Sequence, residues 1–80
     1  MKTAREIFEN KFGNFYTPDL GDYEIITFDT FEEIVERHYS DNLDAYIELG
    51  YTDAEMLKLH VLDSLEWQFI ETVLEEILND

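Results

Sequence analysis

The sequence predicts a mainly helical, small single domain over residues 1–80, with room for one short β-hairpin at about residues 15–28 packed on the helices. Three observations predict this fold class. The chain has 80 residues, which suits one hydrophobic core rather than two lobes. It is 45% hydrophobic and 15% aromatic, unlike acidic segments that stay disordered. Apolar residues also recur at helical spacing along most of the chain.

The first helix is expected within residues 3–12. Thr3 and Glu6 have the spacing of a capping box, in which a hydroxyl and a carboxylate satisfy the first amides of a helix. The apolar residues of this segment share one helical face: Ala4, Ile7, Phe8 and Phe12. Gly13 and the following Asn are expected to end the helix.

A β-hairpin is expected next. Residues 18–21, Pro-Asp-Leu-Gly, have the composition of a turn and separate residues 15–17 from the β-prone residues 23–28. A two-stranded ribbon is marginally stable by itself, so its apolar side has to lie on a helix.

Two further helices are expected in the middle of the chain. The longer one begins at Asp29 or Thr30, ends within residues 39–42, and has an inner face of Phe31, Ile34, Val35 and His38. A short one follows over residues 43–49. It stops at Gly50, which suits the left-handed backbone that often follows a helix end.

Thr52 and Glu55 repeat the capping-box spacing and open the longest helical segment, residues 53–78. Glu66 lies at the centre of the apolar face of this segment, where an unpaired carboxylate is unfavourable. Two interpretations remain open. Either the chain breaks near Asp63, which then caps a new helix with Glu66 at its third position, or Glu66 is partly buried and pairs with Arg37 or Arg5.

The charge of the chain is strongly negative. Twenty acids and five bases give a formal charge of −15, and residues 19–80 hold eighteen of the acids with two of the bases. This balance argues against direct binding to nucleic acid or to an anionic membrane, because both require a basic surface. The N-terminus lacks the apolar run of a signal peptide, and no stretch approaches the length of a membrane span. We therefore expect a soluble, cytoplasmic protein.

Catalytic and metal-binding patterns are not found in the sequence. The chain has no cysteine, which excludes a disulfide framework and a thiolate zinc site. The acids do not have the spacing of an EF-hand loop, and His38 and His60 belong to no metal-binding helix motif. We expect a non-enzymatic protein without a cofactor or a bound metal.

The acids also repel one another along the predicted helices. Pairs such as Asp44 with Glu48 and Glu71 with Glu75 lie four residues apart, which costs a helix roughly 0.2 to 0.5 kcal/mol for each pair. Duplex DNA carries about one charge per 1.7 Å, so the net charge of residues 19–80 corresponds to roughly 27 Å of duplex. A domain of this length has a diameter of roughly 30 Å. The chain can therefore present a charge density close to that of duplex DNA.

In size, charge and aromatic content the chain resembles the small acidic DNA-mimic inhibitors of phages and mobile elements, the antirestriction and anti-CRISPR proteins. The resemblance implies an inhibitor that occludes the DNA- or RNA-binding site of a basic protein, such as a Cas effector or a restriction enzyme, in the host cytoplasm. The expected partner-binding carboxylates are Asp19, Asp22, Asp29, Glu32, Glu36, Asp44, Glu48, Glu71 and Glu75. Tyr16, Tyr46 and Tyr51 are expected to be exposed aromatic anchors.

Two alternatives remain open. Residues 62–66, Leu-Asp-Ser-Leu-Glu, are similar to the phosphopantetheine attachment segment of acyl carrier proteins. That resemblance implies that Ser64 opens an acidic helix and carries the prosthetic arm. The other alternative is a helical self-assembly or adaptor module whose acidic surface is merely solvated. The sequence is compatible with a monomer or a homodimer.

Overall fold

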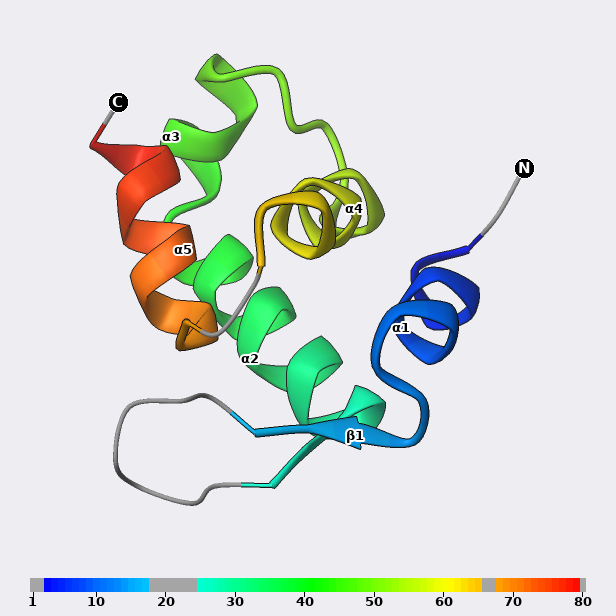
Figure 1. Cartoon of the computed structure of the whole chain (residues 1–80). Coiled ribbons are helices and arrows are strands. Elements are labelled where there is room, and N and C mark those ends of the chain that lie inside the picture. The colour runs from blue at the N-terminus through cyan, green and yellow to red at the C-terminus, as the bar shows by residue number, and fades with distance from the viewer. Residues whose placement is uncertain (1–2, 18–24, 66–67, 80) are drawn as a thin grey trace.

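Five helices and one two-stranded hairpin form the described part of the chain, residues 3–17, 25–65 and 68–79, in a computed structural model (Figure 1). The mainly helical fold and the hairpin are thereby confirmed. The elements are α1 (Ala4–Phe12), β1 (Phe15–Tyr16), β2 (Ile26–Thr27), α2 (Phe28–Asp41), α3 (Leu43–Glu48), α4 (Ala54–Ser64) and α5 (Ile70–Leu78). Helix α2 contacts the four other helices and β2, and α1, α4 and α5 each pack on at least two helices.

The predicted caps of α1 are confirmed. The hydroxyl of Thr3 accepts a hydrogen bond from the amide of Glu6 at 3.3 Å, which satisfies one of the free amides of the first turn. Gly13 follows the helix with a φ angle of +79°, and its amide donates to the carbonyl of Glu9. Glycine adopts this backbone without the steric penalty of a side chain.

The hairpin is antiparallel and short. Phe15 pairs with Thr27 and Tyr16 pairs with Ile26. Because successive side chains of a strand point to opposite faces, Tyr16 and Ile26 enter the core while Phe15 and Thr27 are exposed. The turn predicted at residues 18–21 lies outside the described residues.

Helix α2 begins earlier than the sequence predicted. Its N-cap is Thr27, whose hydroxyl accepts a hydrogen bond from the amide of Thr30 at 3.4 Å. The helix therefore starts at Phe28, and the predicted start at Asp29 or Thr30 is wrong by one or two residues. The earlier start has a physical reason. Thr27 is the last residue of β2 and also the N-cap of α2, so the helix can begin directly after the strand. Phe28 is then the first helical residue and is buried in the core.

The end of α3 is confirmed at Gly50. This glycine has a φ angle of +103° and its amide donates to the carbonyl of Ile47 at 3.0 Å. The amide of Tyr51 reaches back to the carbonyl of Tyr46 at 2.9 Å. Together these two bonds form a Schellman motif, which satisfies the last carbonyls of the helix.

Helix α4 begins one residue later than the predicted capping box. Asp53 is the N-cap, and its carboxylate accepts a hydrogen bond from the amide of Met56 at 2.8 Å. A carboxylate at this position both caps the first turn and complements the positive end of the helix dipole. The hydroxyl of Thr52 instead contacts the sulfur of Met56.

The segment predicted as residues 53–78 is two helices, so the predicted break is confirmed but its place is wrong. Asp63 lies inside α4 and does not cap a new helix. The chain leaves the helix at Leu65, which has extended backbone and is fully buried. Helix α5 then starts after Phe69, and this offset allows both Leu65 and Ile70 to enter the core. The interpretation in which Asp63 caps a helix with Glu66 at its third position is therefore wrong, and Glu66 itself lies outside the described residues.

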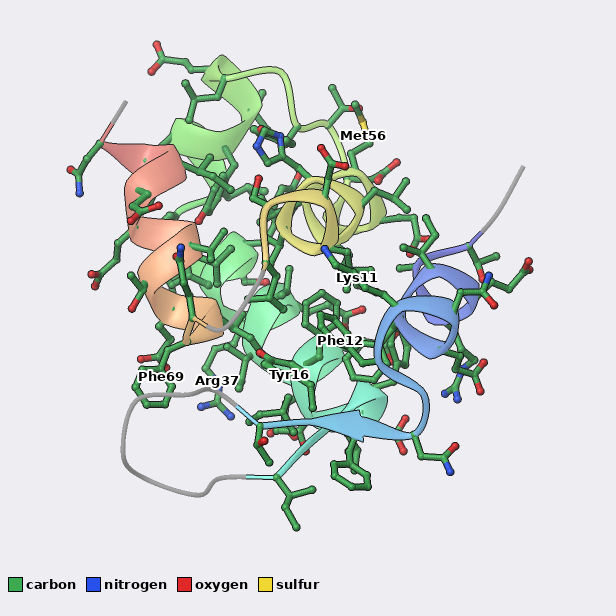
Figure 2. All side chains as sticks on the ribbon, in the orientation of Figure 1. Lys11, Phe12, Tyr16, Arg37, Met56 and Phe69 are labelled. Carbon is green, nitrogen blue, oxygen red and sulfur yellow. The ribbon has the colours of Figure 1, made fainter. Side chains whose placement is uncertain are left out.

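Helices α1 and α4 lie side by side and run in the same direction. The amide of Ala4 donates to Oε2 of Glu55 at 2.9 Å, and at the other end Nζ of Lys11 donates to the carbonyl of Leu62 at 2.6 Å. Figure 2 shows Lys11 extending from α1 toward α4. Parallel helix dipoles repel each other, but here a carboxylate lies at the two N-termini and an ammonium at the two C-termini, which is the favourable arrangement.

Two groups of ring side chains lie in the core or beside it. Phe8 contacts the rings of the first group, near α1 and the hairpin, at centroid distances of 5.3 to 6.0 Å: Phe12, Tyr16, Phe28 and Phe31. The second group lies where α3 meets α2 and α4, and its members are His38, Tyr39, Tyr46, Tyr51 and His60. None of the helices in the described residues is long and apolar enough to cross a membrane.

Candidate acidic interface

The ammonium group of Lys58 lies among three carboxylates. Its Nζ atom is 2.8 Å from Glu36, 3.0 Å from Glu32 and 3.8 Å from Glu55, and only 6% of the side chain is exposed. Burial lowers the pKa of Lys58, but the hydrogen bonds with Glu36 and Glu32 raise it more, so the net pKa is above the usual value of a lysine. Lys58 therefore stays charged and holds α4 against α2.

This contact changes the role of two predicted partner-binding residues. Glu32 and Glu36 are half-exposed, but each accepts a hydrogen bond from the ammonium of Lys58 and forms an ion pair with it inside the fold. Asp29 is also paired, with the guanidinium of Arg5 at 3.2 Å. Three of the carboxylates assigned to a partner from sequence thus have a basic neighbour within the fold.

The remaining described bases also have partners inside the chain. Arg37 pairs with Glu33 one helical turn away at 3.0 Å, and Lys11 donates to the backbone of α4. Lys2 lies outside the described residues. Every basic side chain that the structure describes is therefore engaged by the protein itself.

Ten exposed carboxylates of the described residues have no ion pair with these bases, and six of the ten lie on α5, α3 and the adjoining end of α2. We call these six the acidic face: Asp41, Asp44, Glu48, Glu71, Glu75 and Glu76. Helices α3 and α5 lie together at one side of the molecule (Figure 1). The hydroxyl of Tyr46 in α3 donates to the carbonyl of Leu74 in α5 at 3.4 Å. Five of the six carboxylates of the acidic face thus lie on two helices in contact, and Asp41 lies at the end of α2.

Four members of the acidic face were predicted from sequence and two were not. Asp44, Glu48, Glu71 and Glu75 were assigned because they repeat at four-residue spacing on exposed helical faces. Asp41 and Glu76 were missed, although each continues an exposed row of the same helices and is exposed in the structure. The predicted residues Asp19 and Asp22 lie outside the described residues.

The predicted exposure of Tyr16 and Tyr46 is wrong. Tyr16 is buried because its ring packs on Phe12 at a centroid distance of 4.7 Å. Tyr46 is completely buried, and its hydroxyl is 2.7 Å from Nδ1 of His38. Burial, with a smaller effect of the nearby Tyr51 hydroxyl, raises the pKa of Tyr46 to about 12. A neutral tyrosine can be buried when its hydroxyl has a partner, so a large aromatic content does not require exposed rings.

Tyr51 is half-buried and lies at the edge of the second aromatic group. Its hydroxyl is 2.6 Å from Nδ1 of His60, and burial raises its pKa. Tyr51, His60, Leu49 and Ile77 line a hollow of about 160 Å³. Of the three predicted aromatic anchors, Tyr51 is therefore the one that borders this hollow next to α3.

An apolar strip accompanies the acidic residues of α3. Leu43, Ile47 and Leu49 are 43%, 47% and 46% exposed, and we call them the α3 strip. Leu43 and Ile47 lie one turn apart on the same side of the helix. Asp44 and Glu48 follow them by one residue each, so the apolar row and an acidic row run next to each other along α3.

The environment of Ser64 differs from that implied by the carrier-protein resemblance. Ser64 is the last residue of α4, whereas the resemblance implies a serine that opens a helix. The expected geometry is therefore wrong, because α4 continues through Asp63 to this residue. Among the described residues there is also no group of three side chains placed to hold a metal ion.

No protein-family model, no curated protein and no solved structure matches the chain at a significant level.

Proposed function

We propose that this chain is a non-enzymatic inhibitor that binds a basic protein at its nucleic-acid site and blocks that site. The observation that carries the proposal is the distribution of charge: every described base has a partner within the fold, while the six carboxylates of the acidic face have none. Such a surface lacks counter-charges of its own, and a partner rich in lysine and arginine would supply them.

The dimensions of the molecule support nucleic-acid mimicry. It measures 33 × 31 × 18 Å, so its longest dimension is close to one turn of duplex DNA, about 34 Å. One such turn carries about 20 phosphate charges, compared with a net charge of −15 for this chain. A groove that accommodates one turn of duplex would therefore meet a body of similar length and comparable charge.

The mechanism would be electrostatic attraction followed by steric exclusion. A strongly acidic surface accelerates the approach to a basic groove, and this acceleration weakens as salt screens the charges. Once bound, the 80-residue body fills the space that the nucleic acid needs. No chemical step is required, and the partner would be a defence or DNA-processing protein of the host cytoplasm.

The test is competition with DNA. Binding should be measured to a panel of restriction, CRISPR and repair proteins at two salt concentrations, with and without unlabelled duplex DNA. We expect binding to at least one of them that weakens with salt and is displaced by the duplex. Binding that is indifferent to both salt and duplex would contradict the proposal.

A pair of variants with equal charge locates the contact. E71Q/E75Q removes two charges from the acidic face, whereas E9Q/D63N removes two exposed charges from α1 and α4. If only net charge mattered, both variants would lose the same affinity. We expect E71Q/E75Q to weaken binding several-fold more than E9Q/D63N. Equal losses would mean that the acidic face is not the contact.

A further inference from the structure

The α3 strip is not explained by mimicry of a phosphate backbone. A phosphate backbone offers charge and hydrogen-bond acceptors along its length, and it has no counterpart to the exposed side chains of Leu43 and Ile47. On α3 each of these apolar residues is followed directly by an acid, Asp44 or Glu48, so the helix presents an apolar row next to an acidic row. A partner surface that fits α3 must therefore combine apolar and basic side chains.

We propose that the α3 strip is the docking site for a basic amphipathic helix of the target protein. The proposal rests on the function proposed above and specifies the contact within it. The partner helix would place apolar side chains, spaced three or four residues apart, over Leu43 and Ile47. Lysine or arginine residues on its adjoining side would lie beside Asp44 and Glu48. This pattern is one of the ordinary modes of helix recognition.

The end of the strip has a place for an apolar anchor. Leu49 borders the hollow of about 160 Å³ that it shares with Tyr51, His60 and Ile77. The hollow is lined by the aliphatic side chains of Leu49 and Ile77 and by the rings of Tyr51 and His60, and its volume can take an apolar side chain. An anchor in such a pocket, surrounded by less important contacts, is how many protein interfaces obtain most of their affinity.

Charge selects this occupant over a second copy of the chain. In a symmetric dimer each copy uses the same surface, so Asp44 and Glu48 of the two copies would lie close together. These residues have no ion pair with the bases that the structure describes. Like charges brought together in an interface are unfavourable, whereas a basic helix supplies the missing counter-charge.

The test uses a synthetic probe and the full chain. The probe is a fluorescent leucine–lysine peptide of about 15 residues, long enough for a marginal helix, with its leucines at helical spacing. A second peptide has the same composition in an order without an amphipathic face. Fluorescence anisotropy measures binding of both to the wild-type chain, to L43Q/I47Q and to a matched control, F15Q/I25Q, which removes two exposed apolar side chains from the hairpin instead.

We expect the amphipathic peptide to bind the wild-type chain about tenfold more tightly than the rearranged peptide, and L43Q/I47Q to lose about tenfold in affinity while F15Q/I25Q does not. Glutamine is a good helix former, and circular dichroism checks that each variant is folded. The single variant I47Q provides the same comparison if the double variant is not folded.

Three results would each overturn the inference. The first is equal affinity of the wild-type chain for the two peptides, and the second is equal affinity of L43Q/I47Q and the wild-type chain for the amphipathic peptide. The third is a molecular mass in solution that doubles as the concentration of the wild-type chain rises but does not double for L43Q/I47Q. The last result would assign the strip to a second copy. None of these results decides whether duplex DNA displaces the chain from a basic protein, so a failure here is distinguishable from a failure of the proposed function.

Discussion

The Nζ atom of Lys58 lies 2.8 Å from Oε2 of Glu36, and the lysine side chain is 6% exposed. Glu32, one turn earlier on α2, accepts a second hydrogen bond from the same ammonium at 3.0 Å. In a chain with four times as many acids as bases, one base is thus buried between two helices rather than placed on the surface. Lys58 offsets the repulsion among the acids that surround it.

Replacing Lys58 with methionine should therefore lower the free energy of unfolding. Methionine can occupy the apolar part of the lysine site, but Glu32, Glu36 and Glu55 would lose their shared counter-charge. Loss of one partner from a fully buried ion pair costs about 3 to 5 kcal/mol. Here the carboxylates are half-exposed, so we expect about 2 kcal/mol in urea unfolding.

Arg37→Met is the matched control for Lys58→Met, because it also removes one positive charge from a helix. Arg37 and Glu33 are largely exposed, and an exposed pair of this kind contributes less than about 0.5 kcal/mol. Similar losses in the two variants would show that net charge, rather than the buried contact, determines the effect.

Stability should fall at alkaline pH because of Tyr46. Burial raises the pKa of this phenol from 10.0 to about 12. Between these values the unfolded chain releases the proton that the folded chain retains, so rising pH favours unfolding. Below pH 10 the contribution is fully present, and it is lost as pH rises to about 12, at a cost on the order of 2 kcal/mol. The raised pKa of Lys58 acts in the same direction.

The measurement is urea unfolding at several pH values between 9 and about 12, compared in the wild-type chain and in Tyr46→Phe. The variant has no phenolic proton at this position, so its stability should decline less steeply through this range. An identical slope in the two proteins would show that Tyr46 does not contribute.

Gly50→Ala should destabilise the fold through the backbone alone. Gly50 has a φ angle of +103°, and a side-chain carbon added there would meet nothing within 4 Å. The cost is then the strain of a positive φ angle, about 1 kcal/mol, which corresponds to a melting temperature lower by about 5 °C. Gly50→Asn should cost less, because asparagine tolerates positive φ better. A larger loss for asparagine would contradict this explanation.

E71Q/E75Q should make the free protein slightly more stable even though it weakens the proposed binding. Glu71 and Glu75 are separated by one turn of α5, and removing their repulsion should contribute roughly 0.2 to 0.5 kcal/mol. Thermal unfolding at low salt should show the gain, and high salt should reduce it. E9Q/D63N removes no pair of acids four residues apart, although Glu9 lies three residues after Glu6, so it should show a smaller gain. A loss of stability in E71Q/E75Q would mean that these carboxylates support the fold.

Local signals in the sequence were sufficient for much of the fold. The hydroxyl of Thr3 and the backbone freedom of Gly50 act within a few residues, so their effects can be predicted from spacing. The first residues of α2 and α4 differ from the predicted ones because Thr27 and Asp53 cap these helices in place of the predicted residues. The position of the break after Ser64 depends on burying Leu65 against distant parts of the chain, which spacing alone does not reveal.

The candidate site was predictable to the extent that it depends on helical periodicity. The acidic row of α5 is exposed because Ile70, Val73 and Leu74 of the same helix enter the core. In α3 only Tyr46 is buried, so both its acidic row and its apolar row are exposed. The involvement of Glu32 and Glu36 with Lys58 was not predictable, because these residues are 26 and 22 positions away from the lysine. The burial of Tyr46 likewise depends on His38 and on the backbone of α5, which are brought together only by the tertiary fold.

The contacts between α1 and α4 also have a consequence for synthesis of the chain. Both Ala4 with Glu55 and Lys11 with Leu62 join residues that are 51 positions apart. As the polypeptide leaves the ribosome, α1 emerges first, but its partners on α4 are added only when most of the chain has been translated. A helix of 9 residues is marginal without packing. We therefore expect α1 to dock on α4 only after most of the chain has been translated.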